Sequence, residues 1–229
     1  MSRITVFLPC RAGSQRIPNK NTRSFAGIYG GLLKIKLDQL VEVKAIDQII
    51  VSTNDEVVKK LVQEFKFKNV EIDDRPDQLG SSETSTDDLI KYVPTIIHNG
   101  HVLWTHVTSP FYNKALYEKA INQYHEKVLE GEFDSLMSVT TIQKFLWNKE
   151  TPINYDRNIE KWPRTQTLEK VYEVDSGIFL NSIENYKSMD DRIGKKPSLF
   201  EVDSRAAMDI DWPMDFEICE KIYQEELKF

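Results

Sequence analysis

A polar loop near the start of the chain has the residue types needed to bind a strongly charged anion. It follows the apolar run Ile4-Thr-Val-Phe-Leu and reads Pro9-Cys-Arg-Ala-Gly-Ser-Gln-Arg-Ile-Pro-Asn-Lys-Asn. A glycine allows close backbone approach, while arginine and lysine provide charge and hydrogen bonds. The chain contains neither a GxxxxGK[ST] P-loop nor a GxGxxG fingerprint. We therefore predict a phosphate-binding turn of another type, formed by Arg11, Gly13, Ser14, Arg16, Lys20 and Asn21.

A pair of carboxylates near the other end of the sequence could bind a metal ion. The segment Asp209-Ile-Asp-Trp-Pro places Asp209 and Asp211 two residues apart. In an extended segment such residues point the same way, and paired carboxylates suit Mg²⁺, which also binds water and phosphate oxygens. The alternative is that Asp211 only caps a helix that begins at Pro213. Combined with the cationic first loop, the pair favours Mg²⁺ held by both carboxylates.

The distribution of charge supports a local anion site. The formal net charge is −6, yet residues 1–37 contain seven Lys or Arg and no Asp or Glu, so the rest of the chain carries −13. A solvated basic face is the alternative. The acidic total argues against nucleic acid as a partner.

The sequence also limits where the protein works. No apolar run is long enough to span a membrane, and two cysteines cannot form a disulfide framework. We expect a cytoplasmic protein without a membrane partner. Cys10 is next to Arg11, whose charge should lower the thiol pKa, so we expect Cys10 to be sensitive to alkylation.

Apolar patterning predicts alternating strands and helices. This order is typical of an α/β fold with a doubly wound, mostly parallel sheet, in which ligands bind at the carboxyl ends of the strands. We expect a single domain over residues 1–229, since its length suits one core. The predicted strands are 4–9, 48–53, 69–72, 101–107, 171–180 and 199–203, and the predicted helices are 31–43, 55–65, 87–97, 113–130 and 213–227.

One segment, 140–170, has no clear period. Phe145, Trp147 and Trp162 lie among polar residues there. We interpret it as an excursion from the sheet that acts as a dimerisation arm, because aromatic side chains are enriched in interface cores. An ordinary long loop anchored by these aromatics is the alternative.

The first loop resembles the opening motif of the CMP-sialic acid synthetase (acylneuraminate cytidylyltransferase) family, which includes enzymes for legionaminic and pseudaminic acids. The shared pattern is Pro-x-Arg-x-Gly-Ser-x-Arg-Ile-Pro-x-Lys-Asn. Gln15 departs from it, because many relatives have Lys there. The resemblance implies a Rossmann-like nucleotidyltransferase fold with an inserted arm. The CTP-binding residues that it implies are Arg11, Ala12, Gly13, Ser14, Arg16, Lys20 and Asn21, together with Arg75, Ser81 and Ser82 near the cytosine.

Two later segments resemble the family's sugar-binding regions. The first is Val107-Thr-Ser-Pro-Phe, and the second is made of two separate stretches, Trp162-Pro-Arg-Thr-Gln and Asp175-Ser-Gly-Ile-Phe. Relatives that act on sialic acid use an Arg to contact the substrate carboxylate, and this chain has Val174 at that position. The implied substrate-binding residues are His106, Thr108, Ser109, Arg164, Gln166 and Ser176.

The resemblance implies a homodimeric enzyme that moves CMP from CTP to the anomeric hydroxyl of an acidic nine-carbon sugar and releases pyrophosphate. Asp209-Ile-Asp-Trp-Pro-Met-Asp-Phe-Glu is similar to the family's metal segment. We expect Arg11, Lys20, Asp209 and Asp211 to be catalytic and Mg²⁺ to be the cofactor. Alternatives are a CMP-KDO synthetase, a sugar-1-phosphate nucleotidyltransferase and a nucleotide-binding module without activity. The loop end Ile17-Pro-Asn-Lys-Asn favours the nine-carbon branch over KDO enzymes.

Overall fold

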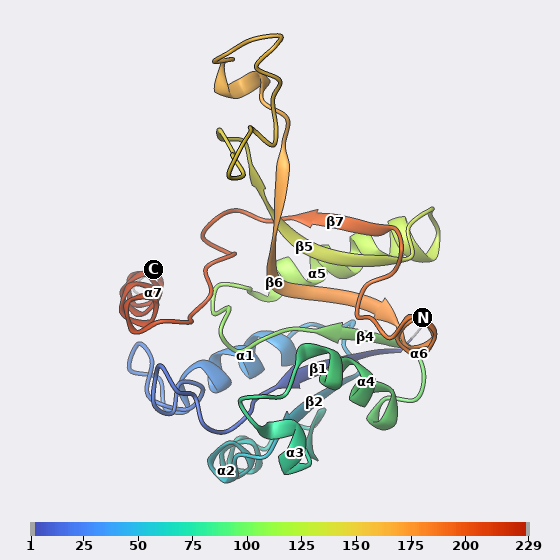
Figure 1. Cartoon of the computed structure of the whole chain (residues 1–229). Coiled ribbons are helices and arrows are strands. Elements are labelled where there is room, and N and C mark those ends of the chain that lie inside the picture. Colours follow the sequence, from blue (N-terminus) through green and yellow to red (C-terminus); the bar gives the residue numbers. More distant parts are fainter. Residues whose placement is uncertain (1–2, 228–229) are drawn as a thin grey trace.

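Seven strands form one sheet in the order β3-β2-β1-β4-β6-β5-β7 (Figure 1), in a computed structural model that describes residues 3–227. Four of the six neighbouring pairs are parallel, which confirms the predicted mostly parallel sheet. The exception is β6, which runs antiparallel to both β4 and β5. The strands are β1 Ile4–Pro9, β2 Gln48–Thr53, β3 Val70–Asp74, β4 His101–Trp104, β5 Ser135–Ile142, β6 Val171–Ser182 and β7 Pro197–Glu201.

Helices cover both faces of the sheet. Successive side chains of β1 point to opposite faces, and apolar ones pack against helices on each face. Ile4, Val6 and Leu8 pack in one core with residues of α1, α2, α5 and α7, whereas Phe7 packs in a second core with residues of α4 and α6. The helices are α1 Gly31–Val41, α2 Glu56–Phe65, α3 Asp77–Gly80, α4 Thr86–Ile96, α5 Lys114–Tyr124, α6 Ile183–Met189 and α7 Pro213–Glu226, with a π-helical turn at His125–Leu129 and a 3₁₀ turn at Thr165–Thr167.

The start of the last helix decides between the two interpretations of Asp211. The N-cap residue of α7 is Trp212, and Asp215 accepts the backbone N–H groups of Asp211 and Trp212 at 3.1 and 2.7 Å. The Asp211 side chain is therefore not the cap, although Pro213 is the first helical residue as predicted.

The predicted excursion is present with a shorter range. Strand β5 continues to Ile142, which pairs with Val171 of β6, so the segment outside the sheet is 143–170. It projects from the body of the molecule at the top of Figure 1. Asn154 holds it together by bonding the carbonyl oxygens of Lys144 and Glu169 at 2.9 and 3.0 Å. Among the helices of residues 3–227, none is long and apolar enough to cross a membrane.

Candidate active site

The first loop leaves the carboxyl end of β1 and is anchored to the neighbouring strand. The backbone N–H of Cys10 donates to Ser52 O at 2.9 Å, and that of Ala12 donates to Asn54 Oδ1 at 3.0 Å. Gly13 has φ +73°, a conformation that glycine adopts without strain. These constraints hold a turn whose charged side chains extend beyond the edge of the sheet.

Cys10 itself faces the core. Burial raises the pKa of its thiol to about 12, more than the positive charge of Arg75 lowers it. The expectation of a lowered pKa was wrong, because the thiol is buried in the hydrophobic core, where desolvation outweighs the effect of nearby positive charge.

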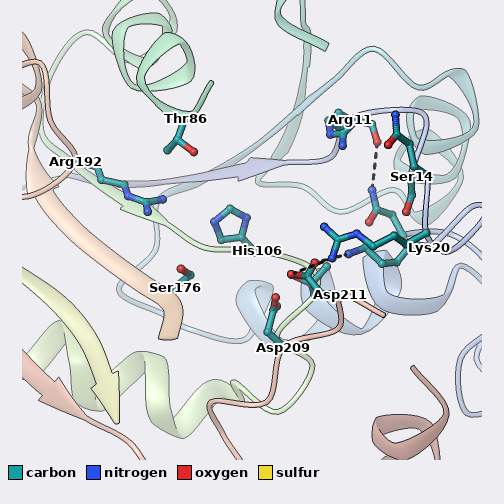
Figure 2. A pocket seen from close by; sticks show the side chains of 13 residues that line it. Arg11, Ser14, Lys20, Thr86, His106, Ser176, Arg192, Asp209 and Asp211 are labelled. Carbon is teal, nitrogen blue, oxygen red and sulfur yellow. Dashed lines mark hydrogen bonds and ion pairs between the residues drawn. The ribbon is translucent and has the colours of Figure 1, made fainter. Parts of the chain in front are cut away.

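The basic turn and the acidic pair meet, as a shared site for a triphosphate and a metal ion requires. Lys20 Nζ donates to Ile210 O at 2.6 Å and lies 3.4 Å from Asp211 Oδ1, across 190 residues of chain. Arg16 Nη1 lies 3.7 Å from Asp211 Oδ2, and its guanidinium stacks 4.7 Å from the Trp212 ring centroid. The ends of the chain therefore build one site, seen at the right of Figure 2.

The carboxylate of Asp209 faces the same pocket beside Asp211 (Figure 2). Desolvation raises the pKa of Asp209, and the negative charge of Asp211 raises it further, against a hydrogen bond from Thr108 that lowers it. Ser109 Oγ is 3.5 Å from Asp209 Oδ1. Residues 3–227 contain no group of three or more His, Cys, Asp or Glu placed so that they could hold a metal ion together. A pair of carboxylates open to a phosphate site still fits Mg²⁺, since that ion keeps several waters and takes phosphate oxygens.

The turn after β4, which contains Thr108 and Ser109, holds the acidic segment of the pocket in place. Backbone N–H of Ile210 donates to Thr108 O at 3.0 Å, which ties the acidic segment to this turn. The buried ammonium of Lys36 donates to Ser109 O at 2.8 Å and to Tyr117 Oη at 2.8 Å. Burial lowers the pKa of Lys36 despite the negative charge of Asp209. Lys36 was predicted only as one of seven cations, since its role depends on packing that no local pattern reveals.

His106 lies in the middle of the pocket (Figure 2). Trp104 Nε1 donates to His106 Nε2 at 3.0 Å, so the imidazole accepts at Nε2 and carries its proton on Nδ1. Desolvation lowers the His106 pKa to about 3, with smaller effects from the positive charges of Arg192, Lys36 and Lys20. The ring is therefore neutral at physiological pH.

The pocket has a volume of ≈ 410 Å³. Most of the residues predicted to bind ligand line it. They are Arg11, Ser14, Arg16, Lys20, Asn21, His106, Thr108, Ser176, Asp209 and Asp211. Gly13 lines a smaller pocket of ≈ 190 Å³ shared with Arg11, Ser14, Lys20 and Asn21.

Other predicted residues lie elsewhere. Arg75 is buried, and its Nε donates to Ser52 Oγ at 2.9 Å. Ser81 and Ser82 are exposed between α3 and α4, with Ser81 Oγ 3.1 Å from Thr84 Oγ1. Arg164 and Gln166 are in the projecting arm. These residues do not line the ≈ 410 Å³ pocket, and their assigned contacts with cytosine or sugar stay predictions.

Three residues that line the pocket were not among those predicted to bind ligand, and one of them, Gln15, was noted only as a departure from the family motif. Thr86 is the first residue of α4, and Arg192 lies in the loop between α6 and β7. Neither belongs to a motif. Val174, at the position where relatives carry Arg, lines a neighbouring pocket instead.

A known protein family covers almost the whole chain. The cytidylyltransferase family model matches residues 5–229. The chain belongs to the cytidylyltransferase family.

Curated members of the family have low identity but nearly full overlap with this chain. A pseudaminic acid cytidylyltransferase of Campylobacter jejuni is 23% identical, with 95% of this chain and 94% of that protein covered. A CMP-N,N'-diacetyllegionaminic acid synthase of Legionella pneumophila is 27% identical, with 97% of each covered.

Solved structures share the cytidylyltransferase fold. A CMP:2-keto-3-deoxy-manno-octonic acid synthetase complexed with CTP has a TM-score of 0.67 at 17% identity and covers 98% of this chain and 100% of its own. A 4-diphosphocytidyl-2C-methyl-D-erythritol synthase of Anaerococcus prevotii has a TM-score of 0.70 at 15% identity, covering 97% and 96%.

Proposed function

We propose that this cytidylyltransferase transfers CMP from CTP to the anomeric hydroxyl of an acidic nine-carbon sugar and releases pyrophosphate. The observation that carries the proposal is the contact between Lys20 of the basic turn and the segment of Asp209 and Asp211. A triphosphate bound there would meet cations from one end of the chain and carboxylates from the other. Relatives named for pseudaminic and legionaminic acids support the substrate class.

The basic turn would hold the β- and γ-phosphates. Arg11, Ser14, Lys20 and Asn21 offer charge and hydrogen-bond donors along one wall of the pocket. Positive charge fixed before the reaction stabilises the negative charge of the departing pyrophosphate without reorganisation. Lys20 is well placed for this, because its carbonyl contact with Ile210 already fixes the ammonium.

Asp209 and Asp211 would hold Mg²⁺, which when bound stabilises charge on the phosphate oxygens. In the transfer, the anomeric oxygen forms a bond to the α-phosphorus. The bond from that phosphorus to the oxygen bridging the β-phosphate breaks, pyrophosphate leaves with the bonding electrons, and the hydroxyl proton passes to solvent water. No covalent intermediate with the protein is needed. His106 would orient the sugar through its neutral imidazole.

The arm at 143–170 would form a homodimer interface. It carries large apolar side chains in the open, with Ile159 87% and Trp162 65% exposed. Phe145 packs against Trp162 with ring centroids 5.5 Å apart, so these aromatics form a preorganised patch. Aromatic patches of this kind are typical of interface cores.

A substrate panel tests the activity. Pyrophosphate release is measured with CTP, Mg²⁺ and each of sialic, legionaminic, pseudaminic, KDN and KDO acids, and with sugar 1-phosphates. We expect turnover with at least one nine-carbon acid and less with KDO or sugar 1-phosphates. CTP binding without turnover on any acidic sugar would instead identify a binding module.

Variants of the acidic pair test the metal assignment. Asp209→Ala and Asp211→Ala should each lower turnover by at least about a hundredfold, the scale of one lost preorganised contact. Chelation of divalent cations should abolish the wild-type activity, and added Mg²⁺ should restore it. Near-normal turnover by both variants would rule out these carboxylates as the metal ligands.

A further inference from the structure

The far wall of the pocket carries an arginine that the phosphate site does not use. Arg192 lies opposite Arg11, Ser14 and Lys20, and its guanidinium extends into the pocket toward His106 (Figure 2). Arg192 is also the charged group with the largest effect on the His106 pKa. The pocket is therefore positive at both ends, with the neutral imidazole between them.

Packing holds this guanidinium in place. Its central carbon lies 3.6 Å from the ring centroid of Phe179 and 5.2 Å from that of Trp104. These two buried residues are direct partners on the antiparallel strands β4 and β6. A planar cation that lies on two fixed rings keeps its orientation, so its N–H groups point out from the rings.

The protein does not neutralise this cation. In residues 3–227, no carboxylate forms an ion pair with Arg192, and its guanidinium donates no hydrogen bond to a protein acceptor. The adjacent Asp191 carboxylate instead accepts the backbone N–H of Ile193 at 3.2 Å. Desolvation lowers the Arg192 pKa, and the nearby Tyr186 and Asp191 offset this effect only in part. A partly buried cation without a partner in a pocket wall is costly unless a ligand pairs with it.

We infer that Arg192 binds the carboxylate of the acidic sugar and so selects for an acidic acceptor; this inference rests on the proposed function. The guanidinium fork matches a carboxylate in a bidentate geometry. With the carboxylate at Arg192 and the triphosphate on the basic turn, the two anions bind at separate ends. The anomeric carbon carries both the carboxylate and the reacting hydroxyl in sugars of this class. Its position between Arg192 and Asp209 directs that hydroxyl toward the α-phosphate.

The test compares an acidic sugar with its carboxamide. For the panel sugar that wild-type protein turns over, kcat/KM is measured for the free acid and for the 1-carboxamide, in wild type, Arg192→Gln and Arg205→Gln. Arg205 is the matched control, because it pairs with Glu226 and lies outside this pocket. Wild type and Arg205→Gln should prefer the acid by at least about 30-fold, the scale of a lost partner in a buried charge pair.

Arg192→Gln should reduce that preference to less than about threefold, through a higher KM for the acid, while the KM for CTP stays within about threefold of wild type. If melting shows that Arg192→Gln does not fold, Arg192→Lys replaces it; lysine keeps the charge but loses the fork, so an intermediate preference is expected.

Two results overturn the inference, and they differ. If wild type is active and the Arg192 variants keep the full preference for the acid, Arg192 does not bind the carboxylate, while the proposed function stands. If wild type releases no pyrophosphate with any acidic sugar, the proposed function fails and this inference falls with it. A role in packing alone predicts a lower melting temperature with an unchanged ratio of acid to carboxamide.

Discussion

Replacing Lys20 by methionine separates the contribution of its ammonium to folding from its contribution to catalysis. The side chain is 14% exposed, and its ammonium contacts Ile210 O at 2.6 Å and Asp211 at 3.4 Å. A hydrogen bond from a charged donor is worth about 1.5–3 kcal/mol. Asp211 is 53% exposed, so solvent screening keeps the ion pair below about 1 kcal/mol. Methionine keeps most of the aliphatic packing.

From these contributions, the free energy of unfolding should fall by about 2–3 kcal/mol. For a chain of this length that corresponds to a melting temperature lower by about 4–12 °C. Turnover should fall much further, by at least about a hundredfold, because the ammonium would also stabilise the departing pyrophosphate. The two assays are differential scanning fluorimetry and pyrophosphate release, at a temperature where the variant is fully folded.

Lys34→Met is the matched control. It removes the same charge from the same basic segment, but Lys34 pairs with Asp38 one helical turn away and does not line the pocket. Its turnover should stay within about twofold of wild type, because a surface pair of this kind is worth only about 0.3–0.5 kcal/mol. A Lys20→Met variant with turnover within about threefold of wild type would refute the placement of the phosphates on this turn.

Three further predictions concern the thiols, the core and the arm. Cys10 should resist iodoacetamide at pH 8 in the native protein and react in urea, because its pKa of about 12 keeps the thiol protonated and the side chain is buried; rapid native labelling seen by mass spectrometry would contradict this. Gly177→Ala should lower the melting temperature by about 2–12 °C, since a Cβ there would lie 2.2 Å from ring atoms of the buried Tyr112; an unchanged calorimetric transition would show that the ring can move. Ile159→Asp should convert a dimer to a monomer in light scattering without changing the circular dichroism, and a mass that is unaffected would exclude this part of the arm from the interface.

Local sequence patterns predicted much of this structure. Hydrophobic alternation and helical spacing depend on neighbouring residues, so they located β1, β2 and the helix that Asp55 caps. The reversed direction of β6 was not predicted, because an apolar run does not encode which way its partner strand runs. The helix predicted over 87–97 begins one residue earlier, at Thr86, because Ser85 and Asp88 form a capping box there.

The sequence by itself determined the two charged segments of the site. A basic, glycine-containing loop and an acidic pair are recognisable from residue types within a short stretch, and both line the pocket. Only the tertiary structure decided which other side chains join them. Arg192 reaches the pocket because two aromatic rings from different strands support it. Lys36 does not line the pocket, but from helix α1 its buried ammonium holds the turn after β4. Such positions depend on contacts between residues far apart in the chain, which spacing along the sequence does not specify.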